Sequence, residues 1–399
     1  MARFDPFRGV RYAGQPLDRV IAPPYDVVDP AERALLAARS PYNAVHLELP
    51  EPDPATGADR YAAAASLLRT WVGSGVLAAD AVPALYPYRT TTPEGRSSTG
   101  VLGALSIGDD VLPHEETLPK PRSDRLDLQR ATAANLSPIW ALSLTRGLTD
   151  HFAPDGPPVA DVVDDDGVRH QLWVVADADT IAAVGESVAG APLVLADGHH
   201  RYETAKAYRA EARAAHGDRP GPYDAVLALV VELTAEQLAV GPIHRLVHGL
   251  DSPPDVPATF GPWFAAEPAG PLTEEVVAPL ARARELAVLT PHGVWRLARR
   301  PPGGPATRPA GDPPAGTLLD AAAADRAVDT LAGAERSYDD RWEAVLAAVR
   351  CGVAQAGILL RPVTVEQIAE HAAAGRRMPP KTTFFTPKPR SGMVYRLLT

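Results

Sequence analysis

Proline is the residue whose distribution most restricts how this chain can fold. The chain has 42 prolines among its 399 residues, and each one restricts its own φ angle and removes a backbone hydrogen-bond donor. Within residues 301–316, ten of the sixteen residues are proline or glycine. Because no helix or strand persists at that density, we expect an exposed loop in this stretch.

A second group of prolines predicts a boundary in the middle of the chain. It covers residues 253–257 and continues at Pro262, and such clusters are typical of the segments between folded parts. We therefore expect a C-terminal α+β region at residues 251–399, which contains the loop at 301–316. The mixed helix and strand pattern near the start predicts an N-terminal α+β region (residues 1–110), and residues 111–250 are expected to form a central core.

Hydrophobic periodicity predicts helices and strands in mixed order. The expected helices are residues 59–72, 123–135, 201–215, 318–332, 342–350 and 365–374. The expected strands are residues 85–91, 100–107, 172–176, 193–196, 225–233, 243–247 and 357–360, with the first two joined as a hairpin. Because strands and helices do not alternate strictly, we expect an α+β fold with mixed sheets and flanking helices rather than a doubly wound sheet.

Composition excludes several classes of protein. The formal net charge is −10, so direct nucleic-acid binding over a basic surface is not expected. The single cysteine, Cys351, rules out an intramolecular disulfide and a cysteine-cluster metal site. The first residues lack the apolar run of a signal peptide, and the longest aliphatic run, residues 225–231, is too short to span a bilayer. We expect a cytoplasmic protein that does not bind membranes.

The segment around Asp197-Gly198-His199-His200-Arg201 carries the strongest chemical signal. An apolar strand runs into a glycine, and a helix begins at once with two histidines and an arginine. The start of a helix is electropositive, so each cation placed there costs about 0.3–1 kcal/mol. An anionic ligand would relieve that cost, glycine allows a close approach, and an arginine can hold phosphate oxygens with several donors. The segment predicts a phosphate-binding site.

Other interpretations of this segment stay open. Asp197 could serve only as a helix N-cap, with the histidines as hydrogen-bonded structural residues. A metal site is less favoured, because adjacent residues of a helix point about 100° apart and do not easily chelate one ion. The segment has neither the Walker glycine loop nor the G-x-G-x-x-G pattern of dinucleotide-binding folds.

Several blocks in one order resemble the bacterial family catalogued as domain of unknown function 1015, from end to end of the chain. The blocks are residues 6–12, 22–27, 114–119, 135–139, 196–205, 244–246 and 378–383. The central block also resembles the phosphate-binding motif of the ParB and sulfiredoxin superfamily, which includes the free serine kinase. This second resemblance implies that residues 111–250 form a ParB-like nucleotide-binding core.

The second resemblance also implies roles for individual residues. Gly198, His199, His200 and Arg201 would bind the phosphates of ATP or ADP, and Mg²⁺ would arrive with the nucleotide. Asp197 and His200 would take part in catalysis. Residues 111–116 match a strand that ends in a carboxylate near the phosphate helix, which makes Glu115 the candidate base. Lys120 and Arg122, which follow it, would add positive charge near the phosphates.

Substrate-binding candidates lie elsewhere in the chain. Tyr25 and Asp26 follow Pro23-Pro24 on a stiff extended segment, where a side chain loses little conformational entropy on binding. His244 and Arg245 belong to a predicted strand, and on alternating strand geometry only one of the two can face the site. Lys381 follows two prolines and is a further candidate to close over the site.

Two functions are compatible with these observations. A kinase of a small hydroxyl substrate, such as free serine or a similar hydroxy amino acid, needs charge neutralisation, alignment and a base. A regulatory module that binds a nucleotide without turnover would use the same phosphate site. The acidic balance favours the kinase, with a small-molecule substrate as its partner and a homodimer left open. A Ser-His-Asp hydrolase is a third alternative, weakened because no G-x-S-x-G elbow is present.

Overall fold

A computed structural model describes residues 2–113, 123–152, 156–300 and 318–399. The chain forms two compact units: unit 1 comprises residues 1–239 and 387–399, and unit 2 comprises residues 240–386. This division differs from the three parts expected from the sequence. Strand β5 (Ser97–Ser106) pairs with β12 (Ala225–Glu232), so residues on both sides of position 110 share one sheet. The predicted loop at residues 301–316 lies outside the described residues.

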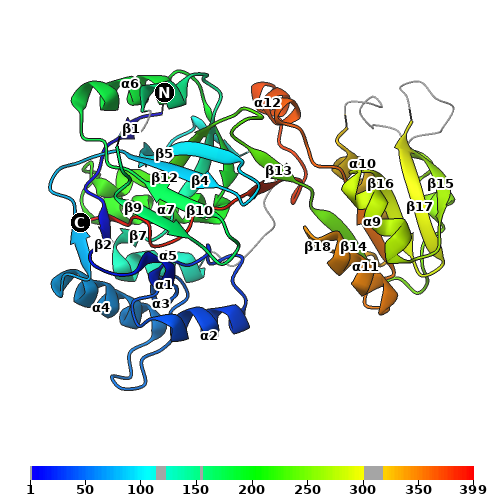
Figure 1. The fold of residues 1–399 in the computed structure, drawn as a ribbon, viewed down its shortest axis with the longest axis horizontal. Helices are drawn as coiled ribbons and strands as arrows, with labels where there is room; N and C mark the ends of the chain where they lie inside the picture. Colours follow the sequence, from blue (N-terminus) through cyan, green and yellow to red (C-terminus); the bar gives the residue numbers. More distant parts are fainter. Residues whose placement is uncertain (1, 114–122, 153–155, 301–317) are drawn as a thin grey trace. The chain divides into compact units, whose positions relative to one another are not determined.

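Unit 1 is built on a nine-stranded mixed sheet (Figure 1). Its strands, in spatial order, are β6 (Val111–Pro113), β11 (Leu193–Asp197), β8 (Ile139–Ser143), β12, β5, β4 (Tyr86–Thr91), β10 (Arg169–Leu172) and β9 (Ala160–Val163), with β1 (Phe4–Asp5) paired to β5. The pairs β6–β11 and β8–β12 are parallel, and the other pairs are antiparallel. Every residue of β12 is buried, as expected for a central strand of a covered sheet.

Helices and short strand pairs complete unit 1. They are α1 (Leu17–Val20), α2 (Pro30–Arg39), α3 (Val45–Glu48), α4 (Arg60–Gly73), α5 (Ser123–Thr132), α6 (Ala178–Ala189), α7 (His199–Ala215), two 3₁₀ turns (Leu148–His151 and Pro222–Asp224) and the pairs β2 (Val10–Tyr12) with β3 (Leu77–Ala79) and β7 (Ala134–Asn135) with β21 (Arg396–Leu397). Figure 1 shows α6 at the top of unit 1, with α2, α3 and α4 together at the bottom.

Hydrophobic clusters organise unit 1, and two of them include residues of its longer helices. In the first, Val184 of α6 and Tyr202 of α7 pack with inward residues of the main sheet. In the second, Trp71 of α4 and Leu128 of α5 pack with Tyr395, which comes from the far end of the chain. The C-terminal segment, which we define as residues 387–399, is therefore part of the core of unit 1.

Unit 2 contains a six-stranded antiparallel sheet with its own hydrophobic clusters. The strands, in spatial order, are β15 (Phe264–Gly270), β17 (Gly293–Arg299), β16 (Leu286–Thr290), β19 (Ala356–Leu359), β14 (His244–His248) and β18 (Glu335–Asp339). The helices are α8 (Val256–Phe260), α9 (Glu274–Arg282), α10 (Asp320–Asp329), α11 (Trp342–Arg350) and α12 (Val365–Ala373). A short pair, β13 (Ala239–Gly241) with β20 (Phe384–Thr386), lies where the chain enters and leaves this unit.

The α+β class with mixed sheets is confirmed, and so are several predicted elements. The hairpin of β4 and β5 turns at Gly95, which has a φ of 86°. The helix predicted at residues 59–72 is α4, whose N-cap Asp59 accepts from two backbone N–H groups. The helix predicted at 123–135 ends earlier, at Thr132, because Ala133 has a positive φ and the chain then forms β7.

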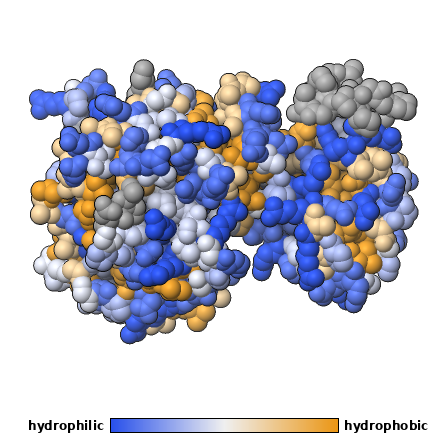
Figure 2. All heavy atoms as spheres, turned by 45° about the horizontal axis from the view of Figure 1, so that its top comes forward, coloured by the Kyte–Doolittle hydropathy of each residue, from blue (hydrophilic) through white to orange (hydrophobic). Residues whose placement is uncertain are grey.

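Surface hydropathy and helix length complete the description. On the face drawn in Figure 2, hydrophilic side chains cover most of the area, and hydrophobic side chains form separate smaller patches. None of the helices in the described part of the chain combines the length and the apolar character that crossing a membrane requires.

Candidate functional site

The glycine turn, which we define as Asp197, Gly198 and the first turn of α7, has the geometry expected for a phosphate site. Strand β11 ends at Asp197, and α7 begins at His199. Gly198 between them has φ 86° and ψ 26°, a left-handed conformation that glycine adopts at no steric cost. The half-buried His199 and His200 take the first two helical positions. The turn leaves the first N–H groups of a 17-residue helix without partners from within the helix.

Arg201 folds back over this turn. Its Nη2 donates to Asp197 Oδ2 at 2.7 Å, and its Nη1 donates to the carbonyl oxygen of Pro138. The excess of positive charge predicted at the start of α7 is therefore partly compensated by Asp197. Burial lowers the pKa of Arg201, but the carboxylates of Asp197 and Asp26 outweigh burial and raise it. Nε of Arg201 is buried and has no hydrogen-bond partner among the described residues.

Lys388, from the C-terminal segment, joins the predicted residues Asp26 and Asp197. Its Nζ lies 3.2 Å from Asp26 Oδ2 and 3.3 Å from Asp197 Oδ1. Asp197 is therefore bracketed by two cations, Arg201 on one carboxylate oxygen and Lys388 on the other. The structure thus links the Tyr25-Asp26 segment to the glycine turn through Lys388, and the predicted substrate-binding role of Asp26 stays a prediction.

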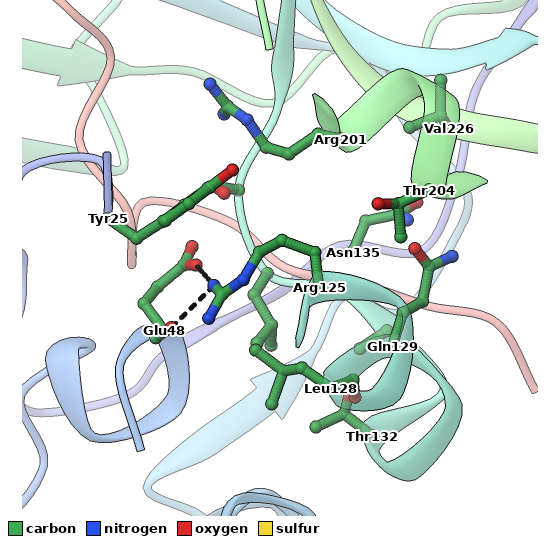
Figure 3. Close-up of a pocket in the computed structure, with 13 residues that line it drawn as sticks. Tyr25, Glu48, Arg125, Leu128, Gln129, Thr132, Asn135, Arg201, Thr204 and Val226 are labelled. Atoms are coloured by element: carbon green, nitrogen blue, oxygen red, sulfur yellow. Dashed lines mark hydrogen bonds and ion pairs between the residues drawn. The ribbon is translucent and has the colours of Figure 1, made fainter. Parts of the chain in front are cut away.

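A small cavity opens beside the glycine turn (Figure 3). Its volume is about 50 Å³, which is room for about three or four water molecules or for a small ligand. The side chains that line it come from the N-terminal region, α5, the segment around β7, α7 and β12. The lining residues are Tyr25, Glu48, Arg125, Leu128, Gln129, Thr132, Ala134, Asn135, Leu136, Ser137, Arg201, Thr204 and Val226.

Two guanidinium groups and one carboxylate dominate the charge of the cavity. Arg125 lies over the ring of Tyr25, with 4.2 Å from its Cζ to the ring centroid, and Arg201 Cζ lies 6.0 Å from the same centroid. Glu48 is buried and lies 3.6 Å from Arg125 Nη1, which also donates to the Glu48 carbonyl oxygen at 2.7 Å. The close-up shows Arg125 and Glu48 directed toward each other beside Tyr25.

Tyr25 lies between these groups and remains a phenol at neutral pH. Burial raises the pKa of Tyr25, while the guanidinium of Arg201 opposes that shift. Its hydroxyl is therefore available as a hydrogen-bond donor to an anionic ligand. Tyr25 lines the cavity, and its substrate-binding role stays a prediction.

Three predicted residues, Glu115, Lys120 and Arg122, lie outside the described residues. The strand that leads to them, β6, pairs in parallel with β11, and its last residue, Pro113, lies opposite Leu195. Since β11 ends two residues later at Asp197, β6 ends at the same edge of the sheet as the glycine turn. Their proposed roles stay predictions.

His244 and Arg245 are buried in unit 2 and bind other protein groups there. The guanidinium of Arg245 is fully buried, pairs with Asp325 at 3.1 Å through both Nε and Nη2, and donates to the carbonyl oxygens of Ile243 and Lys381. His244 Nδ1 accepts the backbone N–H of Leu360 at 3.1 Å. Burial and the charge of Arg245 lower the pKa of His244 to about 4. These contacts give both residues a structural role within unit 2, and their predicted substrate-binding role stays a prediction.

Sequence reasoning missed three charged residues of this site: Glu48, Arg125 and Lys388. Glu48 closes the short helix α3, and Arg125 lies on the polar helix α5, where no motif singles it out. Lys388 had a visible signal, since it stands between two prolines, as Tyr25-Asp26 follows two prolines. Among the described residues, no group of three or more His, Cys, Asp or Glu side chains is arranged to hold a metal ion.

Comparisons with solved structures give distant likenesses. A conserved hypothetical protein from Pyrococcus furiosus is 13% identical with a TM-score of 0.35, and the match covers 72% of this chain and 90% of that one. A free serine kinase in complex with AMP is 13% identical with a TM-score of 0.36 and coverages of 72% and 87%. SbnI from Staphylococcus aureus, with a C-terminal truncation, is 13% identical with a TM-score of 0.38 and coverages of 72% and 84%.

Sequence comparison is more specific. No curated protein matches the chain. The family described as "Protein of unknown function (DUF1015)" matches residues 4–321, which include the glycine turn and all of the residues that line the cavity. With most of its length matched in this way, the chain belongs to the family of unknown function DUF1015.

Proposed function

We propose that this protein is a nucleotide-dependent kinase that phosphorylates a small hydroxyl substrate such as free serine or a similar hydroxy amino acid. One observation carries the proposal: Arg201 belongs both to the glycine turn and to the wall of the cavity, and its buried Nε has no partner among the described residues. A buried donor without a partner costs about 1–3 kcal/mol, and an anion between the turn and the cavity would remove that cost.

The donor nucleotide, ATP or ADP, would place its terminal phosphate at the glycine turn. Gly198 carries no side chain that would hinder the approach, and the first N–H groups of α7 face the phosphate. The nucleotide supplies the phosphoryl group, and Mg²⁺ bound to it neutralises part of the phosphate charge. Arg201 and the helix start would then stabilise the charge on the phosphoryl oxygens as the phosphoryl group is transferred.

The acceptor would lie in the cavity. At about 50 Å³ the cavity suits a small molecule, and two guanidinium groups suit an acceptor that carries a carboxylate. Thr204, Gln129 and Asn135 add uncharged polar groups to the wall. An amino acid with a hydroxyl group has both the size and the charges that this lining could bind, with its ammonium group near Glu48 or Asp26.

The transfer needs a base near the acceptor hydroxyl. Among the described residues, Glu48 is the carboxylate that lines the cavity. A second carboxylate, Asp197, lies at the glycine turn and pairs with Arg201 of the cavity wall. In the proposed step, the acceptor oxygen attacks the terminal phosphorus, the bond from that phosphorus to the leaving oxygen breaks, and the hydroxyl proton passes to the carboxylate. Glu115, the base implied by the family resemblance, is the alternative to Glu48. Substitution of each residue in turn would show which of the two acts as the base.

The direct test is an assay of phosphoryl transfer. Purified protein is incubated with ATP or ADP, Mg²⁺ and one amino acid or hydroxy acid at a time, and products are analysed by mass. We expect one small hydroxy amino acid to gain the mass of a phosphate group. If nucleotide binds and no acceptor gains phosphate, the second function, a regulatory nucleotide-binding module, replaces the kinase.

Substitution of Glu48 tests the base. We expect Glu48→Gln, which keeps the shape of the side chain, to lower kcat by at least about a hundredfold, the usual range for a general base, while nucleotide affinity changes little. Glu51→Gln is the matched control, because Glu51 is largely exposed and pairs with Arg33 at the surface. A Glu48→Gln variant with full turnover would remove Glu48 from the chemistry, and Glu115→Gln would then be the next variant to assay.

A further inference from the structure

Lys388 stands in an unusually stiff part of the C-terminal segment. The local sequence is Pro387-Lys388-Pro389-Arg390, so the lysine is flanked by prolines on both sides. Proline fixes its own φ and disfavours the helical region for the residue before it, which holds Lys388 extended. Its backbone therefore loses little entropy when the side chain binds a partner.

Contacts on the C-terminal side hold this segment in place. Arg390 donates from Nε to Asp164 Oδ2 at 2.7 Å and from Nη2 to Asp166 Oδ2 at 2.8 Å, and its backbone N–H donates to the Tyr88 hydroxyl. The next residue, Ser391, exchanges two backbone hydrogen bonds with Ala22. The segment is therefore anchored to the main sheet and to the N-terminal region by contacts other than those of the lysine side chain.

The anchor at Asp164 is itself reinforced. His170 is fully buried, with Nε2 at 2.7 Å from Asp164 Oδ2 and Nδ1 at 2.7 Å from the Tyr88 hydroxyl. Burial raises the pKa of Asp164, but the hydrogen bond from His170 and the charge of Arg390 outweigh burial and bring the pKa below its usual range. Asp164 thus stays ionised and keeps its ion pair with Arg390.

The ammonium group of Lys388 is held by two carboxylates at distances that favour exchange. Its contacts with Asp26 and Asp197 are 3.2 and 3.3 Å long, whereas a strong N–H···O bond between charged groups is 2.7–2.9 Å long. Both carboxylates are partly exposed, at 35% and 22% of their side-chain surface, while the lysine side chain is 14% exposed. A ligand with phosphate oxygens can therefore reach this group and compete with the carboxylates.

We propose that Lys388 is a phosphate-binding residue of the nucleotide site, and that its ammonium group moves from Asp26 and Asp197 to the phosphate oxygens when the nucleotide binds. This inference rests on the proposed function. Its geometric basis is that Nζ lies 3.3 Å from the residue that directly precedes Gly198, so a phosphate at the first turn of α7 lies within reach of the lysine. Lysine acts on phosphate as a point charge with three donors.

The exchange would also change the state of Asp197. Without nucleotide, Lys388 and Arg201 each occupy one oxygen of its carboxylate. With the lysine on the phosphate, Asp197 Oδ1 would lose its contact with the ammonium group, and the acceptor or water could donate a hydrogen bond to it instead. Nucleotide binding would thus allow the Asp197 carboxylate, at the end of β11, to interact with the acceptor.

Binding measurements on variants test the assignment. The affinities of ATP, ADP, AMP and adenosine, each phosphorylated ligand with Mg²⁺, are measured by calorimetry for the wild type, Lys388→Met, Lys388→Arg and Lys206→Met. Lys206 is the matched control, because it lies on α7 as a half-exposed lysine paired with Glu203. We expect Lys388→Met to weaken ATP about tenfold to a hundredfold, to weaken AMP less and to leave adenosine unchanged, whereas Lys388→Arg retains most of the affinity.

If Lys388 has only a structural role, its substitution should change the four ligand affinities in a different pattern. A loosened C-terminal segment would weaken all four ligands alike and lower the thermal unfolding midpoint, and that result would overturn the assignment. Wild-type affinity for ATP in Lys388→Met would overturn it as well. If the wild type binds ATP but transfers no phosphate, the kinase proposal fails while the lysine assignment is still decided by these affinities. If the wild type binds no nucleotide, both proposals fail.

Discussion

At the glycine turn, single residues decide both the path of the backbone and the local charge. The cations at the start of α7 led us to expect an anionic partner, because they oppose the helix dipole. The described structure contains such a partner within the protein, since Asp197 accepts from Arg201 four residues later. A phosphate at this site would therefore compete with Asp197 for Nη2 of the arginine, whereas Nε has no partner among the described residues.

A substitution at Gly198 separates backbone strain from ligand binding. An alanine there would adopt a left-handed conformation that costs about 1–2 kcal/mol of folding free energy. Its Cβ would also lie 3.1 Å from Arg201 Nε and 3.2 Å from Arg201 Cζ, so the guanidinium must shift. We expect Gly198→Ala to lower the free energy of unfolding by about that cost and to weaken ATP binding about tenfold or more, measured by urea denaturation and calorimetry.

Gly217→Ala is the control for this variant. Gly217 has a φ of 66°, and no atom lies within 4 Å of the position that its Cβ would take. The control should lose a similar amount of stability while it binds ATP as the wild type does. Equal ATP affinity in the two variants would show that the shape of the turn at Gly198 does not matter for binding.

At the scale of elements, the position of β14 within its sheet determines the surroundings of its side chains. The sequence suggested that one of His244 and Arg245 would face a ligand, because strand neighbours point to opposite faces. Both are buried among protein groups, since β14 lies between β18 and β19 inside the sheet of unit 2. A central strand leaves no face exposed when helices cover the sheet.

This burial makes a prediction about pH. The pKa of His244 is about 4 in the folded state and near 6.5 when the chain is unfolded. Above pH 6.5 both states are neutral at this residue, and as the pH falls from 6.5 to 4 only the unfolded state gains a proton. The free energy of unfolding should therefore fall with pH in that window, by about 3 kcal/mol in total from this residue.

Urea denaturation at several pH values from 7 to 4 checks this expectation. His244→Asn is the comparison variant, because its amide oxygen can accept the N–H of Leu360 as Nδ1 does, yet it does not titrate. The variant should lose less stability than the wild type between pH 6.5 and 4. Parallel pH profiles for the two proteins would contradict the assigned role of His244.

At the scale of the whole molecule, the chain completes unit 1 only with its last residues. Met393, Val394, Tyr395 and Leu398 are buried there, and β21 pairs with β7. Unit 2 is formed by residues 240–386 and has hydrophobic clusters of its own. A unit that is continuous in sequence and has its own core can in principle fold alone.

Two polypeptides test this organisation. We expect residues 240–386 alone to unfold cooperatively in urea, as followed by circular dichroism. We expect residues 1–239 alone to be less stable than the same residues joined to 387–399 through a short Gly-Ser linker, because the shorter chain leaves β7 unpaired and part of the core open. Equal stability of the two versions of unit 1 would contradict the structural role of the C-terminal segment.

The sequence by itself determined the local features of this protein. The strand, glycine and helix at residues 193–215 and the hairpin of β4 and β5 follow from backbone preferences and hydrophobic periodicity, which act between residues a few positions apart. Only the tertiary structure decided that Glu48, Arg125 and Lys388 join Tyr25 and Arg201 at one site. That assembly depends on strand pairing and burial between segments up to several hundred residues apart, and local preferences do not encode which segments will meet.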